Sequence, residues 1–118
     1  MRRKILIVDD EPMIALDLEA SLTNAGFEVV GIACTIKEVL ASMESAPCDL
    51  VVLDAMLRDQ SAGPLAKHLR EAGIAFVVAS GHSAKQIDWL EDEPLIQKPF
   101  DQAQLLAGIG QVLEQPNK

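Results

Sequence analysis

Five short apolar runs alternate with longer stretches of helical periodicity along this chain, and that alternation restricts the folds open to it. The apolar runs lie at residues 5–8, 27–32, 50–53, 75–79 and 95–97. They are continuous runs without apolar–polar alternation, as expected for parallel strands that helices cover on both faces. Strict alternation of strand and helix is typical of a doubly wound parallel sheet. We therefore predict an α/β fold with a five-stranded parallel sheet and five helices.

Capping and turn residues set the limits of the predicted helices. The helices are expected at residues 12–25, 35–45, 64–72, 83–90 and from 101 onward. Pro12 suits a first helical turn, and Gly26 follows a predicted helix end. Ser83 and Gln86 have the spacing of a capping box. Residues 59–63 are expected to form a loop before the third helix.

Length and charge limit the classes of function. The 118 residues are enough for one domain, and Asp plus Glu exceed Lys plus Arg to give a net charge of −8. An acidic chain disfavours direct binding to nucleic acid or to an anionic membrane. No apolar run approaches the length of a membrane span. Cys34 and Cys48 lack metal-ligand spacing and are expected to be free thiols, which favours a cytoplasmic location.

Polar side chains stand where four of the five predicted strands end. Asp9 and Asp10 follow the first run, Asp54 the third, Ser80 the fourth and Lys98 the fifth. The carboxyl ends of parallel strands meet along one edge of a sheet, where such folds bind ligands. We therefore expect three carboxylates, a hydroxyl and an ammonium group to lie close together.

This combination of groups suits phosphoryl chemistry. Three close carboxylates repel one another, and a hard divalent cation such as Mg²⁺ relieves that repulsion through oxygen ligands. An aspartate between Mg²⁺ and a lysine is equipped to attack phosphorus, because both cations neutralise charge on the transferring group. A nearby hydroxyl can then donate a hydrogen bond to a phosphoryl oxygen.

In this order and spacing, the motifs resemble the receiver domain of two-component response regulators over essentially the whole length of the chain. The matching residues are Asp9-Asp10, Asp54, Ser80-Gly81 and Lys98-Pro99-Phe100. The resemblance implies a flavodoxin-like sheet of order 2-1-3-4-5 and a single receiver domain over residues 1–118.

The resemblance also implies a role for each matching residue. Asp54 would be the phospho-acceptor, and Asp10 and Asp54 would bind Mg²⁺ or Mn²⁺. The Met56 backbone carbonyl would be a third protein ligand, and Asp9 would act largely through water. Lys98 would pair with the phosphoryl group, and Ser80 would supply the switch hydroxyl. The Gly81 N–H would contact the phosphoryl group.

By the same resemblance, the chain would be a signalling switch and not a turnover enzyme. A histidine kinase or a histidine phosphotransfer protein would supply the phosphoryl group. A protein target would bind the face made by the fourth helix, fifth strand and fifth helix. The position that usually holds a switch aromatic, three residues before the lysine, holds Leu95. The stretch 76–82 is similar to that of a subgroup of stand-alone receivers in phosphorelays.

Several alternatives stay open at this point. The chain could be the receiver part of a larger response regulator or hybrid kinase. An aspartyl-phosphate phosphohydrolase would need a second aspartate two residues after its nucleophile, but Met56 stands there. A flavodoxin-like cofactor binder would need a phosphate-cradling loop after the first strand, where the sequence has the acidic residues 9–11. A receiver that signals without phosphorylation is a further possibility. His82 either influences hydrolysis of the phosphoryl group or has no role. Trp89 either anchors a partner protein or packs against the last helix.

Overall fold

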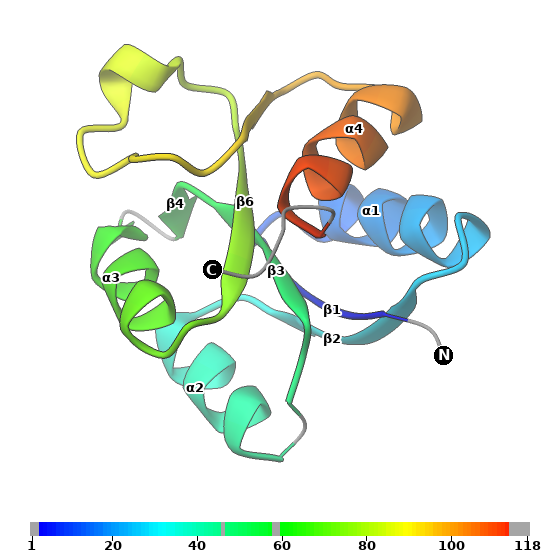
Figure 1. Ribbon diagram of the computed structural model, residues 1–118, viewed down its shortest axis with the longest axis horizontal. Helices are drawn as coiled ribbons and strands as arrows, with labels where there is room; N and C mark the ends of the chain where they lie inside the picture. Colours follow the sequence, from blue (N-terminus) through cyan, green and yellow to red (C-terminus); the bar gives the residue numbers. More distant parts are fainter. Residues whose placement is uncertain (1–2, 46, 58–59, 114–118) are drawn as a thin grey trace.

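A five-stranded parallel sheet of order β2-β1-β3-β6-β7 forms the centre of the protein (Figure 1). The computed structural model describes residues 3–45, 47–57 and 60–113. The strands of this sheet are β1 (Lys4–Val8), β2 (Glu28–Ala33), β3 (Leu50–Asp54), β6 (Ala75–Ser80) and β7 (Leu95–Gln97). Numbered in chain order, these strands give 2-1-3-4-5, so the predicted fold class and strand order are confirmed.

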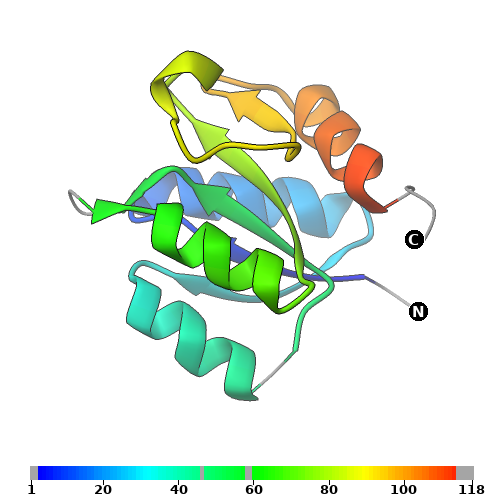
Figure 2. The ribbon, with the colours of Figure 1, turned by 60° about the vertical axis from the view of Figure 1, so that its left-hand side comes forward.

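Four α-helices cover the two faces of the sheet (Figures 1 and 2). They are α1 (Pro12–Asn24), α2 (Ile36–Ser45), α3 (Gly63–Glu71) and α4 (Gln102–Leu113). Successive strand side chains point to opposite faces. Leu6 and Val8 therefore lie in the core beneath α2 and α3, whereas Ile5 and Ile7 lie in the core beneath α1 and α4. Burial on both faces explains why the strands are continuous apolar runs.

Local signals place most helix ends close to their predicted positions. Gly26 has a φ of +97°, a conformation that glycine adopts at little cost, and it turns the chain from α1 into β2. Thr35 Oγ1 accepts the Glu38 N–H at 3.1 Å, which caps α2. Asp101 and Gln104 bond reciprocally at the start of α4, at 2.8 and 2.9 Å. The end of α1 and the starts of α2 and α4 therefore carry residue types that suit the free backbone groups there.

The prediction of a fourth helix at residues 83–90 is wrong. The capping box of Ser83 and Gln86 does form, but it opens only a single 3₁₀ turn, η1 (Ala84–Gln86). Ile87 is extended, with φ −110° and ψ 90°, and it is buried in the core beneath α2 and α3. A helix this short gains little from its own hydrogen bonds. The residues after η1 instead pack against α3. The described residues therefore contain four α-helices and not the predicted five.

A small antiparallel hairpin occupies part of the predicted loop. It consists of β4 (Met56–Leu57) and β5 (Gln60–Ser61), paired Met56 to Ser61 and Leu57 to Gln60. The loop prediction is therefore wrong for Gln60 and Ser61, and Asp59 lies outside the described residues. Leu57 is 1% exposed, so burial of this side chain holds the hairpin against the domain.

Within the described ranges, we find no helix with the length and apolar character that crossing a membrane requires. Cys34 and Cys48 are both free and half-buried, as the sequence predicts.

Candidate functional site

The residues predicted at the strand ends gather at the carboxyl edge of the sheet. Asp9 directly follows β1, and its N–H continues the pairing with β2 by donating to the Ala33 carbonyl at 3.0 Å. Asp54 ends β3, where it is the register partner of Ala79. Ser80 ends β6 next to Ala79. The parallel sheet therefore brings these residues to one edge, although they are far apart in the sequence.

Lys98 follows β7 and connects the carboxylates at this edge. Its N–H donates to the Ser80 carbonyl at 2.8 Å, and its peptide bond to Pro99 is cis. The ammonium Nζ lies 3.2 Å from Asp9 Oδ2 and 3.4 Å from Asp54 Oδ2. A third carboxylate oxygen, Glu11 Oε1, lies 3.4 Å from the same Nζ. One ammonium group therefore contacts three carboxylates.

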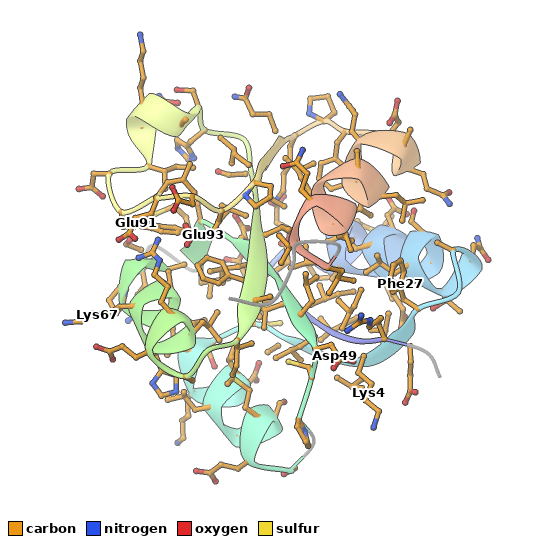
Figure 3. The ribbon with its side chains drawn as sticks, in the orientation of Figure 1. Lys4, Phe27, Asp49, Lys67, Glu91 and Glu93 are labelled. Atoms are coloured by element: carbon orange, nitrogen blue, oxygen red, sulfur yellow. The ribbon has the colours of Figure 1, made fainter. Side chains whose placement is uncertain are left out.

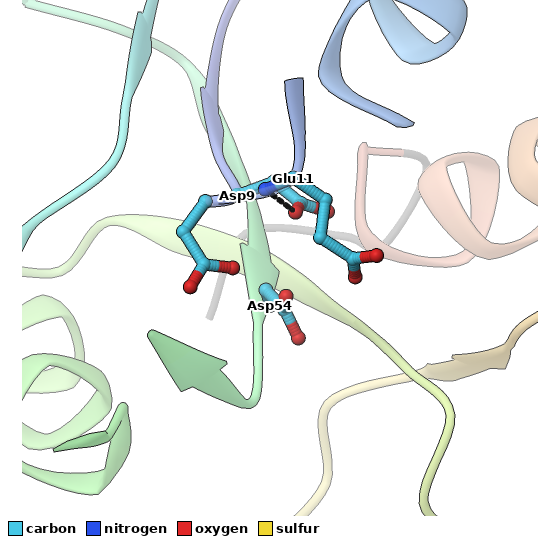
Figure 4. A group of neighbouring side chains, drawn as sticks. Asp9, Glu11 and Asp54 are labelled. Atoms are coloured by element: carbon cyan, nitrogen blue, oxygen red, sulfur yellow. Dashed lines mark hydrogen bonds between the residues drawn. The ribbon is translucent and has the colours of Figure 1, made fainter. Parts of the chain in front are cut away.

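Four carboxylates lie close enough together to hold a cation. Asp9, Asp10, Glu11 and Asp54 each offer one oxygen, and these oxygens lie within 4.8 Å of one another. Figure 4 shows three of them converging, with the Glu11 N–H donating to Asp9 Oδ1 at 2.9 Å. Carboxylate oxygens are hard ligands that suit Mg²⁺ and Mn²⁺. The donor set therefore fits the predicted metal.

Glu11 is the member of this cluster that sequence reasoning did not select. Its side chain is 58% exposed, and it occupies the N-cap position of α1. A signal for it exists in the run Asp9-Asp10-Glu11, because three consecutive acidic residues at a strand end place the third near the first two.

Burial perturbs the acidity of the central carboxylate. Asp54 is 7% exposed, and its pKa is raised from 3.8 to about 6, with desolvation by burial as the largest cause. Lys98 opposes this rise, and the negative charge of Asp9 adds to it. Burial lowers the pKa of Lys98, but Asp54 and Asp9 outweigh that effect, so its net shift is upward. Asp54 is thus a carboxylate whose negative charge a bound cation would stabilise.

Ser80 contacts His82 at the end of β6. Its side chain is buried, and its hydroxyl oxygen accepts the His82 N–H at 3.0 Å. His82 Nδ1 lies 3.3 Å from the same oxygen. Gly81 between them is exposed, and nothing lies within 4 Å of where a Cβ would stand. This contact was not predicted, because the identity of His82 alone does not show which way its ring points.

Met56 stands two residues after Asp54, in β4. Its N–H lies 3.4 Å from Asp54 Oδ1, and its side chain is exposed. The predicted role of its carbonyl as a metal ligand stays a prediction, as does the predicted phosphoryl contact of the Gly81 N–H.

The segment after η1 packs on α3. Arg70 of α3 donates to Glu93 through two bonds of 2.8 Å and to the Trp89 carbonyl at 2.8 Å. Trp89 lies so close to the start of α3 that a Cβ on Gly63 would be 2.9 Å from Cδ1 of the indole ring. Trp89 packs with the core beneath α2 and α3, so packing against the last helix is wrong. Figure 3 shows Glu91 and Glu93 on this segment, above α3.

The parallel sheet with carboxylates and a lysine at its carboxyl edge defines an α/β domain of the flavodoxin-like class. A family model for the response regulator receiver domain matches residues 5–110. The chain belongs to this family, which is a family of signalling domains.

Several named proteins are similar to this chain. The phyllosphere-induced regulator PhyR of Methylorubrum extorquens is 36% identical over 118 residues, which cover 96% of this chain and 44% of PhyR. The solution structure of SdrG from Sphingomonas melonis is 35% identical with a TM-score of 0.83, covering 95% of this chain and 97% of that one. The BeF₃-activated conformation of SdrG is 36% identical, covers 90% and 94% of the two chains, and gives a TM-score of 0.73. The chain spans about half the length of the curated relatives it matches.

Proposed function

We propose that residues 1–118 form one phospho-accepting receiver in which Asp54 takes a phosphoryl group from a phosphohistidine. The observation that carries this proposal is the contact of Lys98 Nζ with both Asp54 and Asp9 at 3.4 and 3.2 Å. In the proposed step, a carboxylate oxygen of Asp54 forms a bond to phosphorus. The bond from phosphorus to the donor imidazole nitrogen breaks, and the imidazole leaves with the electron pair.

The chain's own residues would position and stabilise the transferring group. Lys98 would place its positive charge beside the phosphoryl oxygens, and the Ser80 hydroxyl and Gly81 N–H would donate hydrogen bonds to them. Asp10, Asp54 and the Met56 carbonyl would hold Mg²⁺ or Mn²⁺, with Asp9 acting largely through water. When bound there, the cation would neutralise negative charge on the phosphoryl group.

The proposed partners are proteins. A histidine kinase or histidine phosphotransfer protein would be the donor, as expected for this family, and both would act in the cytoplasm. The target face was predicted to include a fourth helix at residues 83–90, where the structure has only the 3₁₀ turn η1. We therefore assign the proposed target face to β7, α4 and residues 84–93. Pro94, Gln97, Gln104 and Gln111 line a groove of about 410 Å³ there, whose side chains carry no charge. The proposed result is a switch in signalling and not turnover of a substrate.

A second candidate is the receiver part of a longer response regulator or hybrid kinase. One observation favours it: the matched curated relatives are about twice as long as this chain. The full-length reading frame distinguishes the two, because an output or kinase domain on either side of residues 1–118 would show that the receiver does not stand alone.

Intact mass spectrometry after incubation with acetyl phosphate tests the phospho-acceptor. We expect one phosphoryl adduct that requires Mg²⁺ and is absent from Asp54→Asn. Glu28→Gln is the matched control, because it removes one charge from an exposed site at the amino end of β2 and should keep the adduct. An adduct that persists in Asp54→Asn would contradict the assignment.

A further inference from the structure

Among the residues that the structure describes, His82 alone makes hydrogen bonds to the Ser80 hydroxyl. This hydroxyl is buried at the end of β6, and both of the hydrogen bonds that the structure gives it are to His82. The His82 N–H donates to the hydroxyl oxygen at 3.0 Å, and ring Nδ1 lies 3.3 Å from it. His82 itself is exposed. An exposed imidazole therefore contacts the buried hydroxyl to which the proposed function assigns the switch.

The two contacts complement each other if the hydroxyl donates to the ring. Its oxygen already accepts the His82 N–H, and a serine hydroxyl has one proton to donate. With the imidazole proton on Nε2, Nδ1 is an acceptor that takes the hydroxyl proton. A hydroxyl engaged in this way cannot donate to a phosphoryl oxygen until it leaves Nδ1.

No aromatic side chain is available at the usual position to control this hydroxyl. Leu95 stands three residues before Lys98 and packs, partly buried, against the core beneath α2 and α3. A leucine can neither donate nor accept a hydrogen bond, so only packing could connect it to Ser80. The His82 ring is the side chain that makes a polar contact with the hydroxyl.

We propose that His82 is a positioning residue that retains the Ser80 hydroxyl while Asp54 is unphosphorylated. The inference rests on the proposed function, because it assigns the hydroxyl to the phosphoryl group in the other state. Phosphorylation of Asp54 would then have to break the contact with Nδ1, which lowers the phosphorylated fraction.

The test measures the steady-state ratio of phosphorylated to unphosphorylated chain by intact mass, with Mg²⁺ and sub-saturating acetyl phosphate. One hydrogen bond to a neutral group corresponds to a factor of about two to ten in this ratio. We expect His82→Ala to raise the ratio by that factor. His82→Asn should stay near the wild-type ratio, because its amide oxygen can accept the hydroxyl proton in place of Nδ1.

The same pair of variants in a Ser80→Ala background separates this role from a structural one. Without the hydroxyl, His82→Ala should leave the ratio unchanged. An unchanged or lower ratio for His82→Ala alone overturns the inference, and so does an equal rise in both backgrounds. If the wild-type chain takes up no phosphoryl group at all, the proposed function fails and the inference fails with it, so the two failures are distinguishable.

Discussion

Asp54 is buried although it lies at the edge of the sheet. Burial disfavours the ionised form of its carboxyl group. Its pKa rises to about 6 because desolvation and Asp9 together outweigh Lys98. The folded protein therefore binds a proton at Asp54 more tightly than the unfolded chain, where the usual value is 3.8. The stability that comes from this protonation is complete below about pH 4 and is lost as the pH rises through about 6.

Replacing Asp54 with asparagine should stabilise the metal-free protein at neutral pH. The variant stays neutral where the wild-type carboxylate ionises, so we expect its free energy of unfolding to be higher by about 1–3 kcal/mol at pH 7.5. At pH 4 the difference should nearly vanish. Urea denaturation in the presence of a chelator measures both values.

Glu28→Gln is again the control, since it makes the same change in charge at an exposed site and should alter stability little at either pH. An equal gain for Asp54→Asn at pH 4 and at pH 7.5 would show that ionisation of Asp54 is not the cause.

At the scale of elements, Arg70 connects α3 to the segment that follows η1. Its guanidinium bonds both oxygens of Glu93 and the Trp89 carbonyl, and it lies 5.6 Å from the centre of the Phe76 ring. The Arg70 and Glu93 side chains are only 24% and 14% exposed, so solvent screens this pair incompletely. Bidentate pairing with a carboxylate is a strong form of charged hydrogen bond. The segment is thus anchored to α3 instead of forming a helix of its own.

Arg70→Ala should release this segment from α3. We expect a loss of about 1–3 kcal/mol in the free energy of unfolding, because Glu93 and the Trp89 carbonyl lose a charged partner. Amide hydrogen exchange at residues 87–93 should rise more than exchange in the strands of the sheet. Urea denaturation and exchange mass spectrometry measure the two effects.

Glu91→Gln provides the comparison for Arg70→Ala. Glu91 also pairs with Arg70, at 3.2 Å, but its side chain is 65% exposed, so its removal should cost less than about 1 kcal/mol. Equal losses for the two variants would mean that the half-buried pair with Glu93 is not the anchor.

The same segment shows where sequence reasoning succeeds and where it fails. Five apolar runs predicted the strands and their places, because burial on both faces leaves a direct trace in the sequence. The capping box at Ser83 correctly predicted a helical turn but not its length. Arg70, which is distant in sequence, bonds the Trp89 carbonyl within the range of the predicted helix, and no local pattern records that contact. The hairpin of β4 and β5 escaped prediction because two-residue strands carry no periodicity.

In the candidate site, too, some residues could be predicted from the sequence and others could not. Asp9, Asp54, Ser80 and Lys98 could be placed together because parallel strands align their carboxyl ends. The contacts of Glu11 with Lys98 and of His82 with Ser80 depend on how the chain turns after β1 and β6. Such turns are decided by tertiary contacts, so the acidic run at residues 9–11 could only suggest Glu11, and the contact of His82 emerges from the structure.

At the scale of the whole molecule, the net charge of −8 is concentrated unevenly. Four carboxylates share one edge of the sheet, and Lys98 contacts three of them, Asp9, Glu11 and Asp54. Mutual repulsion among them opposes the folded state more than dispersed surface charges do. Binding of a divalent cation to the folded form alone should therefore stabilise the entire domain.

We expect Mg²⁺ to raise the melting temperature of the wild-type protein. At ten times its dissociation constant, a ligand specific for the folded state adds about 1.4 kcal/mol to the free energy of unfolding. For a domain of this size, that gain corresponds to a rise of about 4–8 °C. Thermal unfolding followed by circular dichroism, in Mg²⁺ and in NaCl of equal ionic strength, measures the specific part of the rise.

Asp10→Asn and Asp54→Asn should lose most of this rise, whereas Glu28→Gln should keep it. All three variants remove one negative charge, so general screening of the acidic surface would affect them alike. A rise in Asp10→Asn as large as that of the wild-type protein, or an equal rise in NaCl, would mean that Mg²⁺ acts on the net charge of the molecule. A loss confined to the two cluster variants would locate the binding energy at the edge where Asp9, Asp54 and Lys98 meet.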